Sequence, residues 1–283
     1  MNVSIIIPAQ GSESTELALT LNGIFAQRYD AGQIEVFVVQ YGDRALPSIS
    51  SSRDIRLLAV DHPSPYRARN VAAAEARGDV FLFTEPGCVP DAGWVEAHVA
   101  RMRDHAITIS VGRVIGERMS KSADVFMSYE DTRDTWVFSC GLWKHYFGRP
   151  KNMAVARRRF ETHGPFKEVL RGADSTFVQC VAREVSCNEI AFTPDAIVRQ
   201  ASVFGLPGIF AERFRHARAL RIHRSSHAAP IALEKRVALF RETLAANDYG
   251  AAEAVKLFVL LGAGILAFRL GGLASFRRSH SNR

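Results

Sequence analysis

The chain has 283 residues, and its hydrophobic content of 47% is ordinary for a globular protein with a sizeable core. This length allows one large α/β domain with an appendage, and the composition excludes a chain that is disordered throughout. The formal net charge is +7, which indicates either a surface that attracts phosphate, nucleic acid or anionic lipid, or simply a soluble surface.

The cysteines form no C-x-x-C pair and lie in or beside apolar runs; they are Cys88, Cys140, Cys180 and Cys187. This pattern favours buried, reduced thiols over a zinc site or a disulfide framework. Residues 1–8 lack a basic segment before their short apolar run, so we expect a strand there and not a signal peptide. Both observations predict a protein on the cytosolic side.

Strand and helix patterns alternate over the first hundred residues. Residues 3–7 are rich in β-branched side chains and end at Pro8, which predicts a buried strand that opens into a loop. Apolar residues at helical spacing follow at 16–26. The same patterns predict strands at 34–39, 55–60 and 80–83 and a helix at 67–76. This alternation indicates a doubly wound, mostly parallel sheet that binds a ligand at the carboxyl edge of its strands.

The stretch at 79–91 lies at the centre of this interpretation. Its apolar run ends at a polar turn with prolines, which places Thr84, Glu85 and Gly87 at the predicted ligand crevice. No glycine-rich dinucleotide motif and no P-loop follows any predicted strand, so a Rossmann dehydrogenase and a kinase are disfavoured.

Two blocks of sequence carry a resemblance to a known family. The first consists of VSIIIPA at 3–9, RARNVAAA at 67–74, FLFTEPGCVPD at 81–91 and Trp94. The second consists of NMAV at 152–155, Phe160, GPF at 164–166 and RGAD at 171–174. In order and spacing these blocks resemble the family-2 nucleotide-sugar glycosyltransferases over roughly residues 1 to 200. The resemblance implies a GT-A type fold, a doubly wound mostly parallel sheet, and here a C-terminal helical extension follows it.

The resemblance also implies an activity, which is transfer of a sugar from a nucleotide-sugar donor with inversion of the anomeric centre. Asp174 matches the family's general base, in a motif normally written Glu-Asp that here reads Ala173-Asp174. Taken alone, Asp174 is better explained as a helix N-cap or a surface carboxylate, and its position within the block favours the base. Asn152 and Ala173 are expected on the acceptor side. The expected donor-binding residues are Pro8, Gln10, Glu13, Gln40, Arg67, Arg69, Glu85 and Gly87.

The family's metal-binding pattern is incomplete in this chain. The Asp-x-Asp motif aligns with Glu85-Pro86-Gly87, and glycine offers no side chain to Mg²⁺ or Mn²⁺. Gln200 stands where many members have a histidine ligand, and Gln40 replaces an aspartate that contacts the nucleotide base. Glu85 is therefore the single candidate ligand for a divalent cation, and we expect no confident metal site.

The substituted metal and nucleotide positions leave two functions open. In the first, the protein transfers a sugar without a tightly held metal, and Arg67, Arg69 or Arg171 neutralises the phosphates. In the second, it is a catalytically degenerate scaffold or binding protein that has lost donor and metal chemistry. Nucleic acid is not an expected partner, because no recognisable nucleic-acid-binding module accompanies the positive charge.

The middle segment from 106 to 149 begins with a predicted strand at 107–111 and continues into a stretch rich in aromatic residues. These rings suit either an acceptor-side wall or the core. Three carboxylates in it, those of Glu130, Asp131 and Asp134, are interpreted as a solvated helical face.

The composition changes after residue 200, and we expect three units: a glycosyltransferase-like domain at 1–205, a basic helical region at 206–250 and an apolar membrane-associated tail at 251–283. Residues 210–224 carry five arginines in an amphipathic pattern suited to an anionic membrane surface. A second helix is expected at 233–246. The apolar run at 257–268 is interrupted by Arg269 and is short for a full crossing. The prediction is a protein on the cytoplasmic face of the membrane, peripheral or anchored by its C-terminal tail, that acts on an envelope or lipid-linked acceptor.

Overall fold

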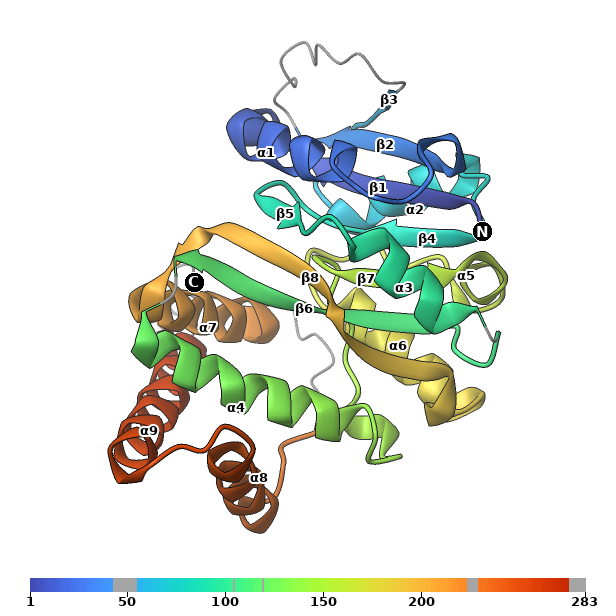
Figure 1. The fold of residues 1–283 in the computed structure, drawn as a ribbon. Helices are drawn as coiled ribbons and strands as arrows, with labels where there is room; N and C mark the ends of the chain where they lie inside the picture. The colour runs from blue at the N-terminus through green and yellow to red at the C-terminus, as the bar shows by residue number, and fades with distance from the viewer. Residues whose placement is uncertain (43–54, 104, 119, 223–228, 275–283) are drawn as a thin grey trace, which may run out of the picture.

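The computed structural model describes residues 1–42, 55–103, 105–118, 120–222 and 229–274 (Figure 1). Its strands form one eight-stranded sheet in the order β3-β2-β1-β4-β7-β6-β8-β5. The strands are β1 (Val3–Ala9), β2 (Ile34–Tyr41), β3 (Ile55–Val60), β4 (Val80–Phe83), β5 (Cys88–Pro90), β6 (Ile109–Arg118), β7 (Met153–Ala156) and β8 (Ile190–Phe204).

The amino-terminal half of the sheet is parallel, as predicted. β1 pairs with β2 on one side and β4 on the other, and β3 pairs with β2. Every residue of β1 is buried, because helices cover both faces of a parallel sheet and leave no polar face on a central strand. The carboxyl ends of β1, β2 and β4 therefore open at one edge.

The direction of the sheet reverses at β7. This strand is antiparallel to β4, with Phe83 opposite Met153, and antiparallel to β6 on its other side. β8 then runs parallel to β6 and antiparallel to the short β5. The sheet is therefore mixed, and β7 joins its two halves.

Helices cover both faces of the sheet. They are α1 (Ser14–Phe25), α2 (Pro65–Glu75), α3 (Trp94–Met102), α4 (Lys121–Val137), α5 (Arg157–His163), α6 (Ala173–Glu184), α7 (Gly205–Ile222), α8 (Leu233–Ala246) and α9 (Ala251–Ala274), with short 3-10 turns at Gly11–Glu13, Ala31–Gln33, Trp143–His145 and Cys187–Glu189. α1 and α3 pack on one core cluster, which includes Ile5 and Ile7; α2, α5 and α6 pack on the other, which includes Ile6. Alternate residues of a strand thus serve opposite layers.

The described cysteines carry free thiols, as predicted. Cys88 is buried, and the other three are partly buried. The aromatic stretch that runs from α4 toward β7 contributes mainly to the core, since Phe126, Tyr129, Phe138 and Tyr146 are buried.

The carboxyl-terminal helices α7, α8 and α9 gather with α4 beside β6 and β8, at the end of the sheet farthest from β3 (Figure 1). β8 ends at Phe204, next to the boundary expected at 205. The division into three units stays a prediction.

α9 is longer than the sequence suggested. Arg269 was expected to interrupt the apolar run, but the helix continues through this residue to Ala274. Residues Ala251–Leu273, with a mean hydropathy of 1.9, are long and apolar enough to cross a membrane by length and composition. One side of α9 is buried through Leu257 and Leu260, whereas Phe258 is 73% exposed. Residues 275–283 of the expected tail lie outside the described residues.

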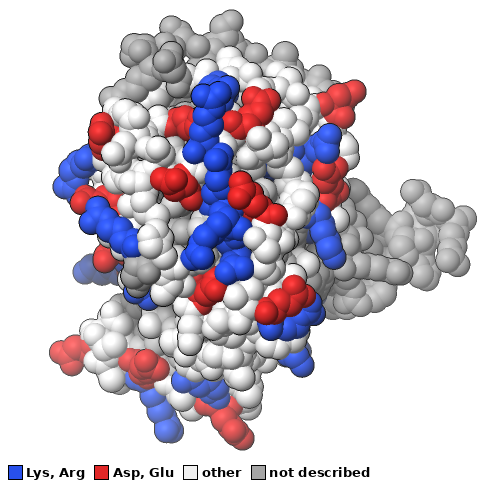
Figure 2. Space-filling view, turned by 90° about the vertical axis from the view of Figure 1, so that its right-hand side faces the viewer, with Lys and Arg blue, Asp and Glu red and all other residues white. Residues whose placement is uncertain are grey.

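Two of the arginines of α7 form ion pairs, and the expected contact of this helix with a membrane stays a prediction. Arg213 pairs with Glu130 of α4, and Arg215 pairs with Glu212 of its own helix. The side chains of Arg221 and Arg224 lie outside the described part of the chain. On the face drawn in Figure 2, Lys and Arg side chains lie among Asp and Glu side chains, so the charge there is mixed.

Asn152 was expected on the acceptor side, which stays a prediction, and in the structure its side chain has a structural role. Its side chain is fully buried just before β7. The amide oxygen accepts hydrogen bonds from Trp94 Nε1 at 2.7 Å and His98 Nε2 at 2.8 Å, and the amide nitrogen donates to the carbonyls of Arg113 and Ala196. Burial lowers the pKa of His98 to about 4, so its imidazole is neutral. Asn152 therefore ties α3, β6, β7 and β8 together.

We predict that Asn152→Ala lowers the free energy of unfolding by about 3 kcal/mol, because buried donors and carbonyls lose their partner. Denaturant unfolding measures this loss. Asn188→Ala, at an exposed position, is the control and should change stability by less than about 0.5 kcal/mol. Equal losses for the two variants would contradict the role of Asn152.

Candidate active site

The carboxyl edge of the parallel strands collects most of the predicted donor-binding residues. Pro8 is buried at the end of β1, and the register of β1 with β2 pairs Ala9 with Gln40. Gln10 follows, and its backbone N–H donates to Glu13 Oε2 at 2.8 Å. Burial raises the pKa of Glu13, and the charge of Glu85 raises it further. The edge is therefore a compact, partly desolvated site.

Arg69 and Glu85 form an ion pair at this edge, between α2 and the end of β4. Arg69 Nη2 lies 2.6 Å from Glu85 Oε1, and the arginine side chain is only 1% exposed. Its guanidinium also lies 5.1 Å from the centre of the Tyr66 ring. Arg69 thus neutralises the carboxylate of the degenerate motif, and its expected role in binding the donor phosphates stays a prediction. Arg67 is exposed and pairs with Glu168 at 2.8 Å.

Asp174 lies in the first turn of α6 and is only 5% exposed. Tyr66 donates its hydroxyl hydrogen bond to Oδ1, and Ser175 Oγ donates to Oδ2 at 3.3 Å. Burial raises the pKa of Asp174, and the Tyr66 hydrogen bond and the charge of Arg69 oppose that effect. The N-cap of α6 is Gly172, so Asp174 is neither the N-cap nor a surface carboxylate.

A glycine lets α6 approach the loop before β7. A Cβ atom built on Gly148 would lie 2.6 Å from the backbone carbon of Asp174, a separation that real Cβ atoms do not show. The Gly148 N–H also donates to Ser175 Oγ at 3.3 Å. Gly148 therefore helps to position the proposed base.

The turn that aligns with the metal motif is held by backbone contacts. Gly87 has a φ of +78°, its N–H donates to the carbonyl of Glu16 at 3.0 Å, and its carbonyl accepts from the N–H of Ala201 at 2.8 Å. The register of β5 with β8 pairs Cys88 with Gln200, so both substituted metal positions lie at one place in the fold.

The side chains at this place do not fit a divalent cation. Glu85 is engaged by Arg69, Gly87 offers no ligand, and hard cations prefer several carboxylate oxygens. In the part of the chain that the structure describes, no group of three or more His, Cys, Asp or Glu side chains has a metal-binding arrangement.

Ala173 is 2% exposed and lines a cavity of about 430 Å³ beside α6. The other residues that line it are Trp143, His163, Pro165, Phe166, Lys167, Thr176, Phe177, Gln179, Cys180 and Arg183. Its assignment to the acceptor side stays a prediction.

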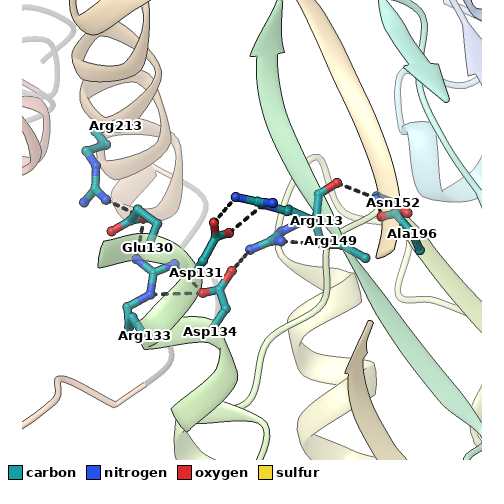
Figure 3. A network of polar contacts seen from close by, with 10 residues as sticks. Arg113, Glu130, Asp131, Arg133, Asp134, Arg149, Asn152, Ala196 and Arg213 are labelled. Carbon is teal, nitrogen blue, oxygen red and sulfur yellow. Dashed lines mark hydrogen bonds and ion pairs between the residues drawn. The ribbon is translucent and has the colours of Figure 1, made fainter. Parts of the chain in front are cut away.

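A polar network lies between α4 and the segment before β7 that contains Arg149 (Figure 3). Asp134 was interpreted as part of a solvated face, but it is only 3% exposed and pairs with Arg133 and Arg149. Burial alone would raise the pKa of Asp134, yet these two arginines lower it. Glu130 pairs with Arg133 and Arg213, and Asp131 pairs with Arg113. The three carboxylates therefore fasten α4 to its neighbours.

Sequence reasoning missed Tyr66, Lys151 and Glu212. Tyr66 connects Asp174 with Arg69, and Lys151 Nζ lies 3.0 Å from Glu212 Oε1 of α7. Tyr66 precedes the RARN segment directly and could have been noticed there. Lys151 and Glu212 belong to no motif, and only the pairing of distant elements brings them to the site.

Comparison with known structures defines the class of fold first. A mannosyltransferase from Pyrobaculum calidifontis, solved with GDP-Man and Mn²⁺, superposes with a TM-score of 0.59 at 18% identity and covers 99% of this chain and 79% of its own. S. aureus TarS 1-349, solved with UDP-GlcNAc, gives 0.51 at 13% identity, covering 99% of this chain and 92% of its own. Glucosyl-3-phosphoglycerate synthase from Mycobacterium tuberculosis gives 0.50 at 15%, covering 82% and 88%. The fold is therefore of the GT-A type, as predicted.

The family follows from the sequence profile. Residues 4–162 match the profile described as "Glycosyl transferase family 2". The chain therefore belongs to this family, and the protein is a glycosyltransferase. No curated protein sequence matches the chain.

We predict that Glu85→Gln lowers the free energy of unfolding by about 3 kcal/mol, because it leaves the buried Arg69 charge without its partner. Glu168→Gln, which breaks the exposed pair with Arg67, is the matched control and should cost less than about 1 kcal/mol. Denaturant unfolding of both variants compares the two pairs. Similar losses would show that the Arg69–Glu85 pair is no stronger than a surface ion pair.

Proposed function

We propose that the protein transfers a sugar from a nucleotide-sugar donor to an acceptor hydroxyl, with Asp174 as general base. In a single in-line displacement, the acceptor oxygen attacks the anomeric carbon while its proton passes to the Asp174 carboxylate. The bond from the anomeric carbon to the diphosphate breaks, the nucleoside diphosphate leaves, and the anomeric centre inverts. Membership of the family supports the reaction class, and the named neighbours were solved with GDP-Man, UDP-GlcNAc or UDP-Glc.

The observation that carries the proposal is the contact of Tyr66 with both halves of the site. Its hydroxyl donates to Asp174, and its ring lies under the guanidinium of Arg69, which holds Glu85 at the donor edge. The base and the donor edge thus belong to one connected set of side chains. A carboxylate whose pKa is raised by burial is also a better proton acceptor at neutral pH than an exposed one.

Two of the named neighbours were solved with Mn²⁺. A divalent cation would supply positive charge to the departing diphosphate, but the side chains of this chain at the motif do not fit one. The proposal therefore takes no step through a metal, and the donor is assigned to the edge lined by Pro8, Gln10, Glu13, Gln40 and Glu85.

A thermal-shift panel of nucleotide sugars, run in EDTA and in Mn²⁺, tests the proposal. A donor that binds only the native state raises the melting temperature. If no nucleotide sugar does so under either condition, the degenerate-scaffold alternative replaces the proposed function.

The acceptor and the location rest on the exposed side of α9. Val255, Phe258, Val259, Leu266 and Leu273 are each more than half exposed, and such an apolar surface suits the boundary between lipid headgroups and acyl chains. We assign the protein to the cytoplasmic face of a membrane, attached through α9, with an envelope or lipid-linked glycan as acceptor.

We predict that Asp174→Asn lowers kcat by about 10² to 10⁴-fold with the donor found above.

Tyr66→Phe tests the sign of the pKa shift of Asp174. The Tyr66 hydrogen bond favours the charged carboxylate, so its removal raises the pKa of Asp174 further, and the acid limb of the kcat/KM profile moves to higher pH. Asp195→Asn, at an exposed position, is the control. Unchanged turnover in Asp174→Asn would exclude Asp174 as the base.

We also predict that the double variant Val255→Glu, Phe258→Glu reduces cosedimentation of the protein with anionic lipid vesicles by at least about tenfold, since two charges on the apolar side oppose insertion. The matched control is Leu233→Glu, Val237→Glu on α8, where the two side chains are also exposed. If both double variants bind as well as the wild type, or lose binding equally, the assignment of the membrane surface to α9 is wrong.

A further inference from the structure

The pairing of β4 with β7 brings a lysine to the turn that aligns with the metal motif. Phe83 lies opposite Met153 in this antiparallel ladder. Extending this register beyond the ladder, two residues after Phe83 and two before Met153, sets Glu85 across from Lys151, and the charge of Glu85 acts on Lys151. Thr84 Oγ1 donates to the carbonyl of Lys151 at 3.1 Å, so the segment after β4 and the segment before β7 stay side by side beyond the ladder. Lys151 therefore stands at the donor edge.

The ammonium of Lys151 remains charged and partly open to solvent. Nζ donates to Glu212 Oε1 at 3.0 Å, and the lysine side chain is 24% exposed. Burial lowers the pKa of Lys151, but Glu85 and Glu212 outweigh that effect and raise it. An ammonium has three N–H donors, and Glu212 accepts from one of them.

Both partners of this ion pair are held by neighbouring residues. Arg149 and Asn152 flank Lys151: Arg149 donates to the Gly112 carbonyl at 2.7 Å, and Asn152 is fixed by the four hydrogen bonds described above. On α7, Arg213 follows Glu212 and pairs with Glu130 of the network in Figure 3. Groups held in this way lose little freedom when a ligand binds.

Two of the three arginines expected to neutralise the phosphates are already held in ion pairs, which favours a further cation at the site. A departing diphosphate requires cationic stabilisation, and Arg69 and Arg67 are engaged by Glu85 and Glu168. Lysine binds phosphate as a compact point charge. We propose that Lys151 occupies the role of the divalent cation and binds the diphosphate of the donor, so that nucleotide binding requires no metal. This inference rests on the proposed function.

Calorimetric titration in EDTA tests the proposal with UDP and GDP, each beside its nucleoside, uridine or guanosine. We expect one of the two diphosphates to bind the wild type in EDTA and Mn²⁺ to tighten its binding by less than about threefold. Lys151→Met should weaken that binding by at least about tenfold, the scale of one lost charge-assisted hydrogen bond. Binding of the nucleoside should be unchanged, because it lacks the phosphates.

Three further variants separate phosphate binding from a structural role. Lys151→Arg keeps a cation and should retain most of the affinity. Lys144→Met removes an exposed lysine from the segment before β7 and should leave binding unchanged. Glu212→Gln also breaks the ion pair but keeps the ammonium, so it should bind the diphosphate at least as tightly as the wild type.

These experiments test the role of Lys151 separately from the proposed sugar transfer. If the wild type binds the diphosphate only with Mn²⁺, or Lys151→Met binds it normally, the inference is overturned and the proposed function stands. If Lys151→Met and Glu212→Gln lose affinity and thermal stability equally, the ion pair is structural and the inference is also overturned. If no diphosphate or nucleotide sugar binds under any condition, both proposals fail.

Discussion

The antiparallel pairing of β7 with β4 is the constraint on which the site depends. It joins the parallel half of the sheet, whose strand ends form the donor edge, to β6 and β8. Without it Lys151 would not stand across from Glu85. Asn152 maintains this junction, because one buried amide satisfies partners from three other elements, and a buried amide that keeps all its hydrogen bonds permits little displacement.

Charge at the site is arranged in pairs that differ in burial. Arg69 is almost fully enclosed and neutralises Glu85, which ties α2 to the turn after β4. Lys151 and Glu212 are more open and link the β7 loop to α7. A buried pair is costly to separate, whereas a partly exposed one can exchange a partner for a phosphate oxygen at smaller cost. This contrast is why the more open cation is the better candidate to meet a ligand.

At the turn that aligns with the metal motif, backbone contacts take the place of metal ligands. The loss of the second carboxylate at Gly87 removes a metal ligand and leaves a turn with positive φ that backbone contacts hold. A second substituted metal position, Gln200, lies at the same place in the fold. The substitutions therefore form one local change of chemistry, while the proposed base Asp174 and its partner Tyr66 are intact.

Much of the fold could be predicted because it depends on local patterns. The β-branched run of β1, the helical spacing of α1 and the apolar run of β4 each report burial directly, so the parallel half followed from the chain. The family resemblance likewise assigned Asp174, Glu85 and Arg69 to one site, and the structure connects them through Tyr66. The patterns were less reliable for residues whose surroundings come from distant segments. Asp134 looked like a solvated carboxylate because its partner Arg149 belongs to another element, and Asn152 looked like a ligand-binding residue because its partners lie on three others.

The sequence by itself determined the family, the parallel character of the amino-terminal half of the sheet and the positions of the degenerate motif and the proposed base, since these are encoded by residues near one another or by ordered motifs. The tertiary structure alone decided which charges meet: Arg69 with Glu85, Tyr66 with Asp174, and Lys151 with Glu212. Ion pairs and hydrogen bonds depend on separations of a few ångströms in space. Strand register and helix packing set those separations, and no pattern along the chain states them.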